Sequence, residues 1–180
     1  MKRYIITGAP GTGKTTLINA LRTNNFYCLE EVSRKIIINE QKNNGNKTPW
    51  QDVVGFTNLV YQKTIADLTI LSDKTTFVDR GLADNIAYLK LHKLPISKHF
   101  FNFDYKKKYH TTVFVLPLWK AIYKEDPQRL QSFEEAKKLQ ELLLETYTNL
   151  GFSIYILPKK SVNKRVEFLK KLIKKQHKPK

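Results

Sequence analysis

The sequence has few of the residues that disulfide-bonded or zinc-binding proteins need. Its single cysteine, Cys28, cannot form an internal disulfide, and its four histidines are scattered without paired metal-ligand spacing (His92, His99, His110, His177). No apolar run approaches the roughly 20 residues that cross a bilayer, and no signal-peptide segment follows Lys2 and Arg3. We therefore expect a cytoplasmic protein without a transmembrane segment.

Acidic residues are also scarce. Sixteen Asp and Glu stand against 32 Lys and Arg, which gives a formal net charge of +16. Such a charge attracts polyanions of any kind, including nucleotides, nucleic acid and anionic lipid headgroups, and does not distinguish among them. The length of 180 residues and the hydrophobic fraction of 41% predict one folded domain over residues 1–180, rather than a disordered chain or a large multidomain assembly.

Short runs rich in β-branched and aromatic residues alternate with stretches of helical apolar spacing. The predicted strands cover residues 3–7, 26–29, 75–78, 112–116 and 153–157, and the predicted helices begin near residue 13 and then include 34–38, 50–71, 82–91, 133–150 and a terminal helix from 161. Residues 41–49 read as an exposed loop, and the irregular tract 93–110 as a lid or an acceptor-site insertion. This alternation predicts an α/β fold with a mostly parallel, doubly wound sheet.

A phosphate-binding loop follows the first predicted strand. Residues 8–15 match the P-loop pattern, and they lie between a strand and a helix, as the motif requires. The predicted nucleotide-binding residues are Gly8, Ala9, Pro10, Gly11, Thr12, Gly13, Lys14, Thr15 and Thr16. In this arrangement Lys14 reaches the β- and γ-phosphates, and the Thr15 hydroxyl ligates Mg²⁺. No Asn-Lys-x-Asp segment is present, which favours ATP while GTP stays open.

Charged residues follow two further predicted strands, where an open α/β sheet binds its ligands. Asp79 is a candidate holder of Mg²⁺-bound water, with capping of the next helix as the alternative. Arg80 is a candidate for binding an acceptor or the transferred phosphoryl group, and the alternative is a surface ion pair with Asp84. Glu31 is the candidate general base for an acceptor hydroxyl, and the alternative is a pair with Arg34 or Arg80.

Residues 119–132 form a candidate lid. Arg129 in this segment would close over the γ-phosphate and stabilise its developing charge, and the alternative is a solvated charge run. Trp119 and Tyr123 stand four residues apart and could stack on a base, although aromatic pairs at this spacing are more often packing.

The C-terminal segment 161–180 predicts a basic helix. Its apolar residues recur on one face, and Glu167 is its single acidic residue. The polar face of a terminal helix accounts for most of these lysines. Binding to RNA, DNA or an anionic lipid surface is the other interpretation.

Several segments together resemble a known family. They are residues 8–16 (GAPGTGKTT), 30–34 (EEVSR), 77–85 (FVDRGLADN) with 87–88 (AY), 117–129 (from PLW to DPQR) and 151–158 (GFSIYILP). The chain resembles the P-loop AAA-domain proteins that are similar to the NadR-type ribosylnicotinamide kinase domain and, more distantly, to nucleoside and nucleoside-monophosphate kinases. The resemblance implies a five-stranded parallel sheet in order 2-3-1-4-5 and Mg²⁺-dependent phosphoryl transfer or hydrolysis. It also implies that four side chains lie near the γ-phosphate (Glu31, Asp79, Arg80, Arg129).

Two classes of function follow. The first is a small-molecule kinase that transfers the γ-phosphoryl group of Mg-ATP to a nucleoside-like hydroxyl. The second is a nucleotide-dependent ATPase or GTPase switch, or a binding protein, whose partner is an anionic lipid or nucleic acid held by the basic C-terminus. A polynucleotide 5′-kinase lies between the two.

Overall fold

The computed structural model describes residues 3–69, 74–123 and 132–176. At its centre lies a five-stranded sheet in the order β2-β3-β1-β4-β5, in which every neighbouring pair of strands is parallel. The strands are β1 (Arg3–Thr7), β2 (Tyr27–Leu29), β3 (Thr76–Asp79), β4 (Thr112–Val115) and β5 (Ser153–Ile156). The α/β class and the order 2-3-1-4-5 are therefore confirmed.

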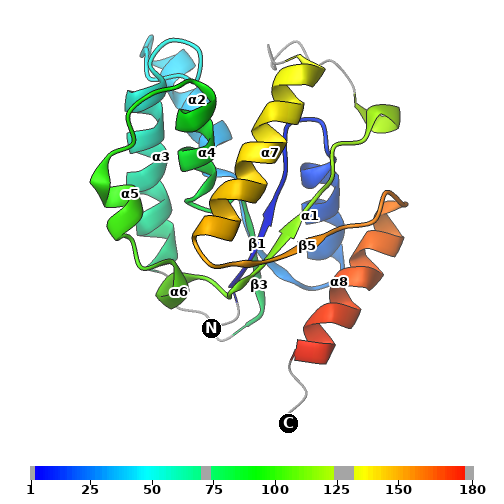
Figure 1. The fold of residues 1–180 in the computed structure, drawn as a ribbon. Helices are drawn as coiled ribbons and strands as arrows, with labels where there is room; N and C mark the ends of the chain where they lie inside the picture. The colour runs from blue at the N-terminus through cyan, green and yellow to red at the C-terminus, as the bar shows by residue number, and fades with distance from the viewer. Residues whose placement is uncertain (1–2, 70–73, 124–131, 177–180) are drawn as a thin grey trace.

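Helices cover both faces of this sheet (Figure 1). One face is packed by α1 (Lys14–Thr23) and α8 (Val162–Gln176), which contact each other, and the other face by α3 (Val53–Leu68), α4 (Asp84–Leu91) and α7 (Phe133–Asn149). The remaining helical segments are α2 (Val32–Lys42), α5 (Lys98–Asn102), α6 (Tyr105–Lys108) and the 3₁₀ turn η1 (Lys120–Ile122). This layering follows from right-handed crossovers between parallel strands.

Alternate residues of the central strands build two separate cores. Ile5 and Val113 point to the α4/α7 side, whereas Tyr4, Ile6 and Phe114 point to the α1/α8 side. All five side chains are fully buried, as expected for central strands of a parallel sheet that is covered on both faces. The two cores hold the strand ends, and therefore the loops that follow them, in a fixed arrangement.

Two helical regions differ from the sequence expectation. The helix predicted over 50–71 begins at Val53, because Asp52 is its N-cap and its side chain accepts a hydrogen bond from the Gly55 N–H. It ends at Leu68, and residues 70–71 lie outside the described residues. The irregular tract 93–110 contains α5 and α6, and it buries three aromatic rings in the core (Phe100, Tyr105, Tyr109). This tract therefore contributes to the core, and its role as a lid or an acceptor-site insertion stays a prediction.

The start of α7 carries a side-chain cap. Ser132 and Glu135 form a reciprocal capping box, and Gly151, two residues after the end of the helix, adopts a left-handed φ of 77°.

Among the residues that the structure describes, no helix is long and apolar enough to cross a membrane.

Candidate functional site

The loop after β1 requires glycine where the chain passes close to its neighbours. Gly8 and Gly11 have φ values of 146° and 76°. A Cβ at Gly8 would lie 2.6 Å from the Leu116 carbonyl oxygen, and one at Gly11 would lie 2.5 Å from the Tyr123 ring. Gly13 is the N-cap of α1, so no cap side chain takes up the free N–H groups at the start of this helix. Such a helix start is suited to binding an anion.

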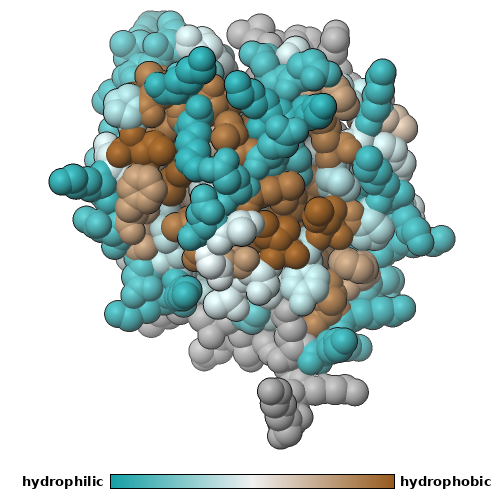
Figure 2. All heavy atoms as spheres, viewed as in Figure 1, coloured by the Kyte–Doolittle hydropathy of each residue, from teal (hydrophilic) through white to brown (hydrophobic). Residues whose placement is uncertain are grey.

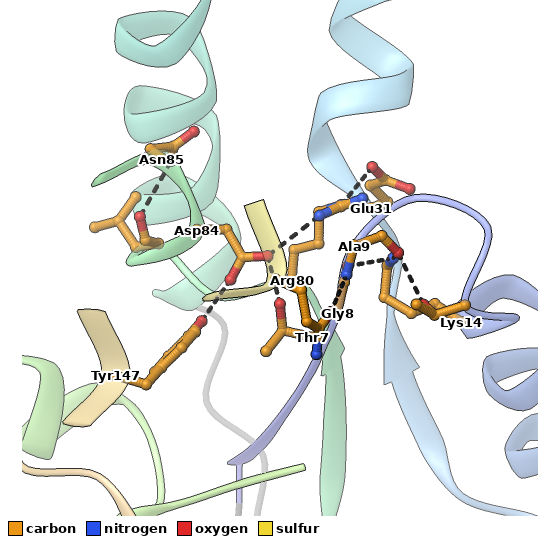
Figure 3. A network of polar contacts seen from close by, with 12 residues as sticks. Thr7, Gly8, Ala9, Lys14, Glu31, Arg80, Asp84, Asn85 and Tyr147 are labelled. Atoms are coloured by element: carbon orange, nitrogen blue, oxygen red, sulfur yellow. Dashed lines mark hydrogen bonds and ion pairs between the residues drawn. The ribbon is translucent and has the colours of Figure 1, made fainter. Parts of the chain in front are cut away.

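Lys14 is buried at the base of this loop. Its Nζ donates to the Gly8 carbonyl at 2.6 Å and to the Ala9 carbonyl at 3.0 Å (Figure 3). Burial, together with the positive charge of Arg80, lowers the pKa of Lys14 to about 7. Thr15 and Thr16, in the first turn of α1, are exposed. The ammonium group is therefore held by carbonyl groups that phosphate oxygens can replace, while the threonine hydroxyls are open to solvent.

Gln140 of α7 holds the same loop from another side. Its Oε1 accepts from the Ala9 N–H at 2.8 Å, and its Nε2 donates to the Leu116 carbonyl at 3.2 Å. Sequence reasoning missed this residue. The sequence feature that could have indicated Gln140 was weak, because it was only an amide side chain next to Leu139 in an amphipathic helix.

Arg80, which follows β3, forms ion pairs with Glu31 after β2 and with Asp84 at the start of α4. Its Nε donates to Glu31 Oε1 at 2.8 Å, and its Nη1 lies 3.3 Å from Asp84 Oδ2 (Figure 3). The structure thus makes both ion pairs that the sequence left as alternatives, with one guanidinium. Arg80 also has a φ of 66°, a left-handed conformation that is unusual for a residue with a Cβ and that often marks functional sites.

Glu31 and Asp79, two of the carboxylates near this guanidinium, have pKa values shifted in opposite directions. Burial raises the pKa of Glu31, but the charges of Arg80 and Lys14 outweigh it and leave the pKa below its usual range. Burial and the charge of Glu31 raise the pKa of Asp79 to about 6. Asp79 Oδ1 is buried and has no hydrogen-bond partner within the described residues. Glu31 is therefore held ionised, whereas Asp79 has an open acceptor position.

A buried carboxylate suits a cation, and Asp79 is the residue here that fits one. No group of three or more His, Cys, Asp or Glu side chains gathers as a metal site in the described parts of the chain. Mg²⁺ in nucleotide sites usually takes one or two protein oxygens, and phosphate oxygens and water supply the others. The unpartnered Asp79 oxygen and the exposed Thr15 hydroxyl fit this pattern.

Asp84 is more central than the sequence suggested. Its Oδ1 accepts from the Tyr147 hydroxyl at 2.6 Å, and its Oδ2 accepts from the Thr7 hydroxyl at 2.6 Å. Asp84 is only 8% exposed, so its pair with Arg80 is not a surface pair. Sequence reasoning missed Thr7 and Tyr147. The sequence feature that could have indicated Thr7 was its position as a polar residue at the end of a buried strand. No sequence feature indicated Tyr147.

A small pocket opens beside Arg80. Residues from β2, α2, α3, β3 and α4 line it, with apolar side chains such as Leu29 and Val60 and polar ones such as Asp67 and Asn85. Asp79 and Arg80 also line it. The pocket therefore adjoins the strand-end charges on the side away from the P-loop helix.

The aromatic residues after β4 pack instead of pairing with each other. The Tyr123 ring lies against Gly11 and meets Phe133 edge-on at 5.1 Å between ring centroids. The Arg165 guanidinium carbon lies 5.5 Å from the centre of the Trp119 ring. Only the first part of the candidate lid 119–132, together with Ser132, is described, and Arg129 lies outside the described residues.

Arg165 does not belong to the exposed basic face of the terminal helix. It is 2% exposed, and its Nη1 and Nε donate to the carbonyls of Thr12 and Pro158 at 3.2 and 3.1 Å. The exposed lysines of α8 in the described structure are Lys164, Lys171, Lys174 and Lys175. Figure 2 shows hydrophilic side chains along the edge of the molecule where Figure 1 places α8. The opposite face of α8 packs in the core through Val166 and Leu169.

Several solved structures share this fold at low sequence identity. A deoxyadenosine kinase from M. mycoides with dCMP and dCDP bound has a TM-score of 0.69 and 13% identity, covering 96% of this chain and 98% of that chain. Thymidylate kinase from Candida albicans has a TM-score of 0.63 and 15% identity, covering 97% and 92%. NadR protein in complex with NR has a TM-score of 0.62 and 22% identity, covering 89% and 46%. These similarities support the fold alone.

A family model gives the assignment that these structures do not. No curated protein matches the chain. The model described as an AAA domain matches residues 3–165, a span that includes the P-loop, all five strands and the Arg80 ion pairs. The chain therefore belongs to this AAA-domain family of P-loop proteins, and its fold is that of nucleoside and nucleotide kinases.

Proposed function

We propose that this protein transfers the γ-phosphoryl group of Mg-ATP to a hydroxyl group of a nucleoside-like acceptor. The observation that carries the proposal is the Glu31–Arg80–Asp84 cluster at the carboxyl end of the sheet. Strands β1 and β3 are neighbours, with Ile6 opposite Asp79, so the P-loop and this cluster emerge at the same edge. A phosphate donor and a hydroxyl acceptor can approach each other there.

The donor half of the site uses the P-loop. Lys14 would exchange its two carbonyl partners for phosphate oxygens, and the free N–H groups at the start of α1 would add further donors. The Ala9 N–H is turned toward Gln140, so we assign the phosphate contacts to the other N–H groups of residues 8–16. Thr15 and Asp79 would hold Mg²⁺, which supplies charge neutralisation at the β- and γ-phosphates when it is bound.

The acceptor half uses Glu31 and Arg80. Because the pKa of Glu31 lies below its usual range, this carboxylate is suited to orienting the acceptor hydroxyl through a hydrogen bond more than to early removal of its proton. Phosphoryl transfer depends mainly on positioning and charge stabilisation, so this role is sufficient. Arg80 would stabilise the charge on the transferred group. Arg129 remains our candidate for a second arginine at the γ-phosphate.

The charges of the pocket favour an acceptor without a phosphate group. Among the described residues that line it, Arg80 is the one cation, while four are carboxylates (Glu30, Asp67, Asp79, Asp84). Arg80 is already shared by Asp84 and Glu31. Arg34 is exposed one turn along α2 and is not among the lining residues. Glu30 and Asp67 are in turn paired with Lys35 and Lys63, at 2.7 and 3.2 Å. No cation of the described lining is therefore left free for a phosphate on the acceptor, which favours nucleosides over nucleotides.

The test is acceptor-dependent transfer of label. Purified protein, Mg²⁺ and γ-labelled ATP or GTP are incubated with nucleosides, ribosylnicotinamide, nucleoside monophosphates and oligonucleotides, with Lys14→Ala as the blank. We expect label on a nucleoside-class acceptor and none with the Lys14→Ala protein. Faster transfer to monophosphates would overturn the acceptor assignment, and acceptor-independent hydrolysis alone would overturn the kinase assignment.

A second candidate function rests on α8. Its exposed lysines, with Glu167 as the single acid of the helix, make a basic strip that suits a nucleic acid or an anionic lipid surface in a nucleotide-dependent switch. Because α8 also packs in the core, its lysines should be substituted rather than the helix removed. A gel shift and vesicle flotation with a Lys→Gln variant at positions 164, 171, 174 and 175 test it. Unchanged binding would exclude this strip as the site.

A further inference from the structure

We infer that Gln140 and Tyr147 are positioning residues, and that α7 uses them to hold the P-loop and Arg80 in a fixed relation. The two side chains are seven residues apart, so they lie on one face of the helix about 10 Å apart along its axis. Gln140 contacts the donor half of the site and Tyr147 contacts the acceptor half through Asp84. The inference rests on the proposed kinase function for its kinetic readout.

The Tyr147 contact fixes Asp84. Tyr147 is 0% exposed and donates to Asp84 Oδ1 at 2.6 Å, so no solvent competes for that oxygen. Thr7 at the end of β1 donates to the other oxygen, also at 2.6 Å. Two short hydrogen bonds from different elements hold the carboxylate in one orientation, in which Oδ2 faces Arg80 Nη1 (Figure 3).

The orientation of Asp84 matters because the backbone of Arg80 is strained. A left-handed residue with a Cβ persists only where its surroundings hold it. Arg80 is held by its own N–H, which donates to the Ile6 carbonyl at 3.0 Å, and by its side-chain pairs with Glu31 and Asp84. Without the Tyr147 hydroxyl, Thr7 alone would hold the Asp84 carboxylate, so the pair of Asp84 with the guanidinium would be less firmly oriented.

The Gln140 contact fixes the P-loop. The side-chain amide uses its oxygen toward Ala9 and its nitrogen toward Leu116, so only one of its two orientations satisfies both partners. The carbonyl of the same Ala9 accepts from Lys14 Nζ and from the Thr12 hydroxyl. Gln140 thus holds the peptide that positions the lysine, while making no contact with Arg80.

This arrangement predicts that the two residues affect different kinetic constants. Tyr147→Phe should lower kcat about ten- to a hundredfold and leave the KM for ATP within about twofold, since a misplaced reacting group reduces the rate of the chemical step. Gln140→Met should raise the KM for ATP about tenfold and change kcat less. Tyr105→Phe is the matched control, because it also removes a buried tyrosine hydroxyl, one that donates to the Phe100 carbonyl at 2.9 Å.

A double-mutant cycle tests whether Tyr147 acts through Arg80. In an Arg80→Ala background, adding Tyr147→Phe should change kcat by less than about twofold. An equal loss in both backgrounds, or a loss in Tyr105→Phe as large as in Tyr147→Phe, would overturn the Tyr147 assignment. An unchanged KM for ATP in Gln140→Met would overturn the Gln140 assignment.

Failure of the kinase proposal can be distinguished from failure of the inference about Gln140 and Tyr147. If the wild-type protein transfers no phosphoryl group, ATP binding by calorimetry still tests Gln140→Met, with an expected tenfold weaker Kd. The exchange rate with solvent of the Arg80 Nη1 protons, which face Asp84, still tests Tyr147→Phe when it is measured by NMR. We expect faster exchange in Tyr147→Phe and no change in Tyr105→Phe, and equal rates in all three proteins would overturn the inference.

Discussion

Replacement of Gly81 by alanine places a methyl group in space that is already filled. A Cβ at this position would lie 2.5 Å from the Tyr147 hydroxyl oxygen and 2.7 Å from Ile5 Cδ1. Both neighbours are 0% exposed, so neither can move into solvent. The Tyr147 hydroxyl is also held at 2.6 Å from Asp84, so moving it would break or distort that bond.

The magnitude follows from three contributions. Forcing a methyl group into a packed core costs about 1–3 kcal/mol. Loss of a hydrogen bond to a charged group costs roughly 1.5–3 kcal/mol. The lower entropy of the unfolded alanine chain stabilises by about 0.4–1 kcal/mol. Because the tyrosine either stays and is crowded or moves and loses its bond, only one of the first two applies, and the net loss is about 1–2 kcal/mol of unfolding free energy.

Urea unfolding followed by circular dichroism measures this loss, and phosphoryl transfer measures its effect on Arg80. Gly45→Ala is the control, because a Cβ there would meet the carboxylate at the end of the flexible Glu40 side chain, which can move aside. We expect Gly45→Ala to change the unfolding free energy by less than about 0.5 kcal/mol. An equally small change in Gly81→Ala would mean that the space around the Tyr147 hydroxyl is not filled, and would refute the reasoning.

Three further predictions concern titratable groups. The folded protein releases the Lys14 proton near pH 7, whereas the unfolded chain keeps it up to about pH 10.5. The unfolded chain therefore binds more protons between these pH values, and the free energy of unfolding rises with pH there. Lys14→Met should raise the melting temperature at pH 7, flatten this rise with pH and abolish stabilisation by ATP. Affinity for Mg-ATP should fall as the pH drops below about 6, where Asp79 takes up a proton, and calorimetry on Asp79→Asn should show weak binding with no such fall. Burial raises the pKa of Cys28 to about 11, so a thiol reagent at pH 7.5 should modify the folded protein far more slowly than the urea-unfolded protein; equal rates would contradict its burial.

Local patterns in the sequence were sufficient for the order of the strands and of the longer helices and for the P-loop, but not for the short helices α5 and α6. A β-branched run that stops at Gly8 and a helical pattern after Gly13 depend only on neighbouring residues, and the structure shows β1 and α1 there. The strand-end residues Glu31, Asp79 and Arg80 could also be placed at one edge of the sheet, because parallel strands bring their carboxyl ends together. Helix ends were less accurate, as at Val53, because a single capping residue decides them.

Only the tertiary structure decided which polar groups meet. Tyr147 bonds a residue 63 positions away, Gln140 bonds one 131 positions away, and Arg165 one 153 positions away. These partners depend on how α7 and α8 pack against the sheet, and no local pattern encodes that packing. A tyrosine in an amphipathic helix or an arginine in a lysine-rich one looks the same in sequence whether it faces solvent or the P-loop. Side-chain burial in the assembled layers is what makes the difference.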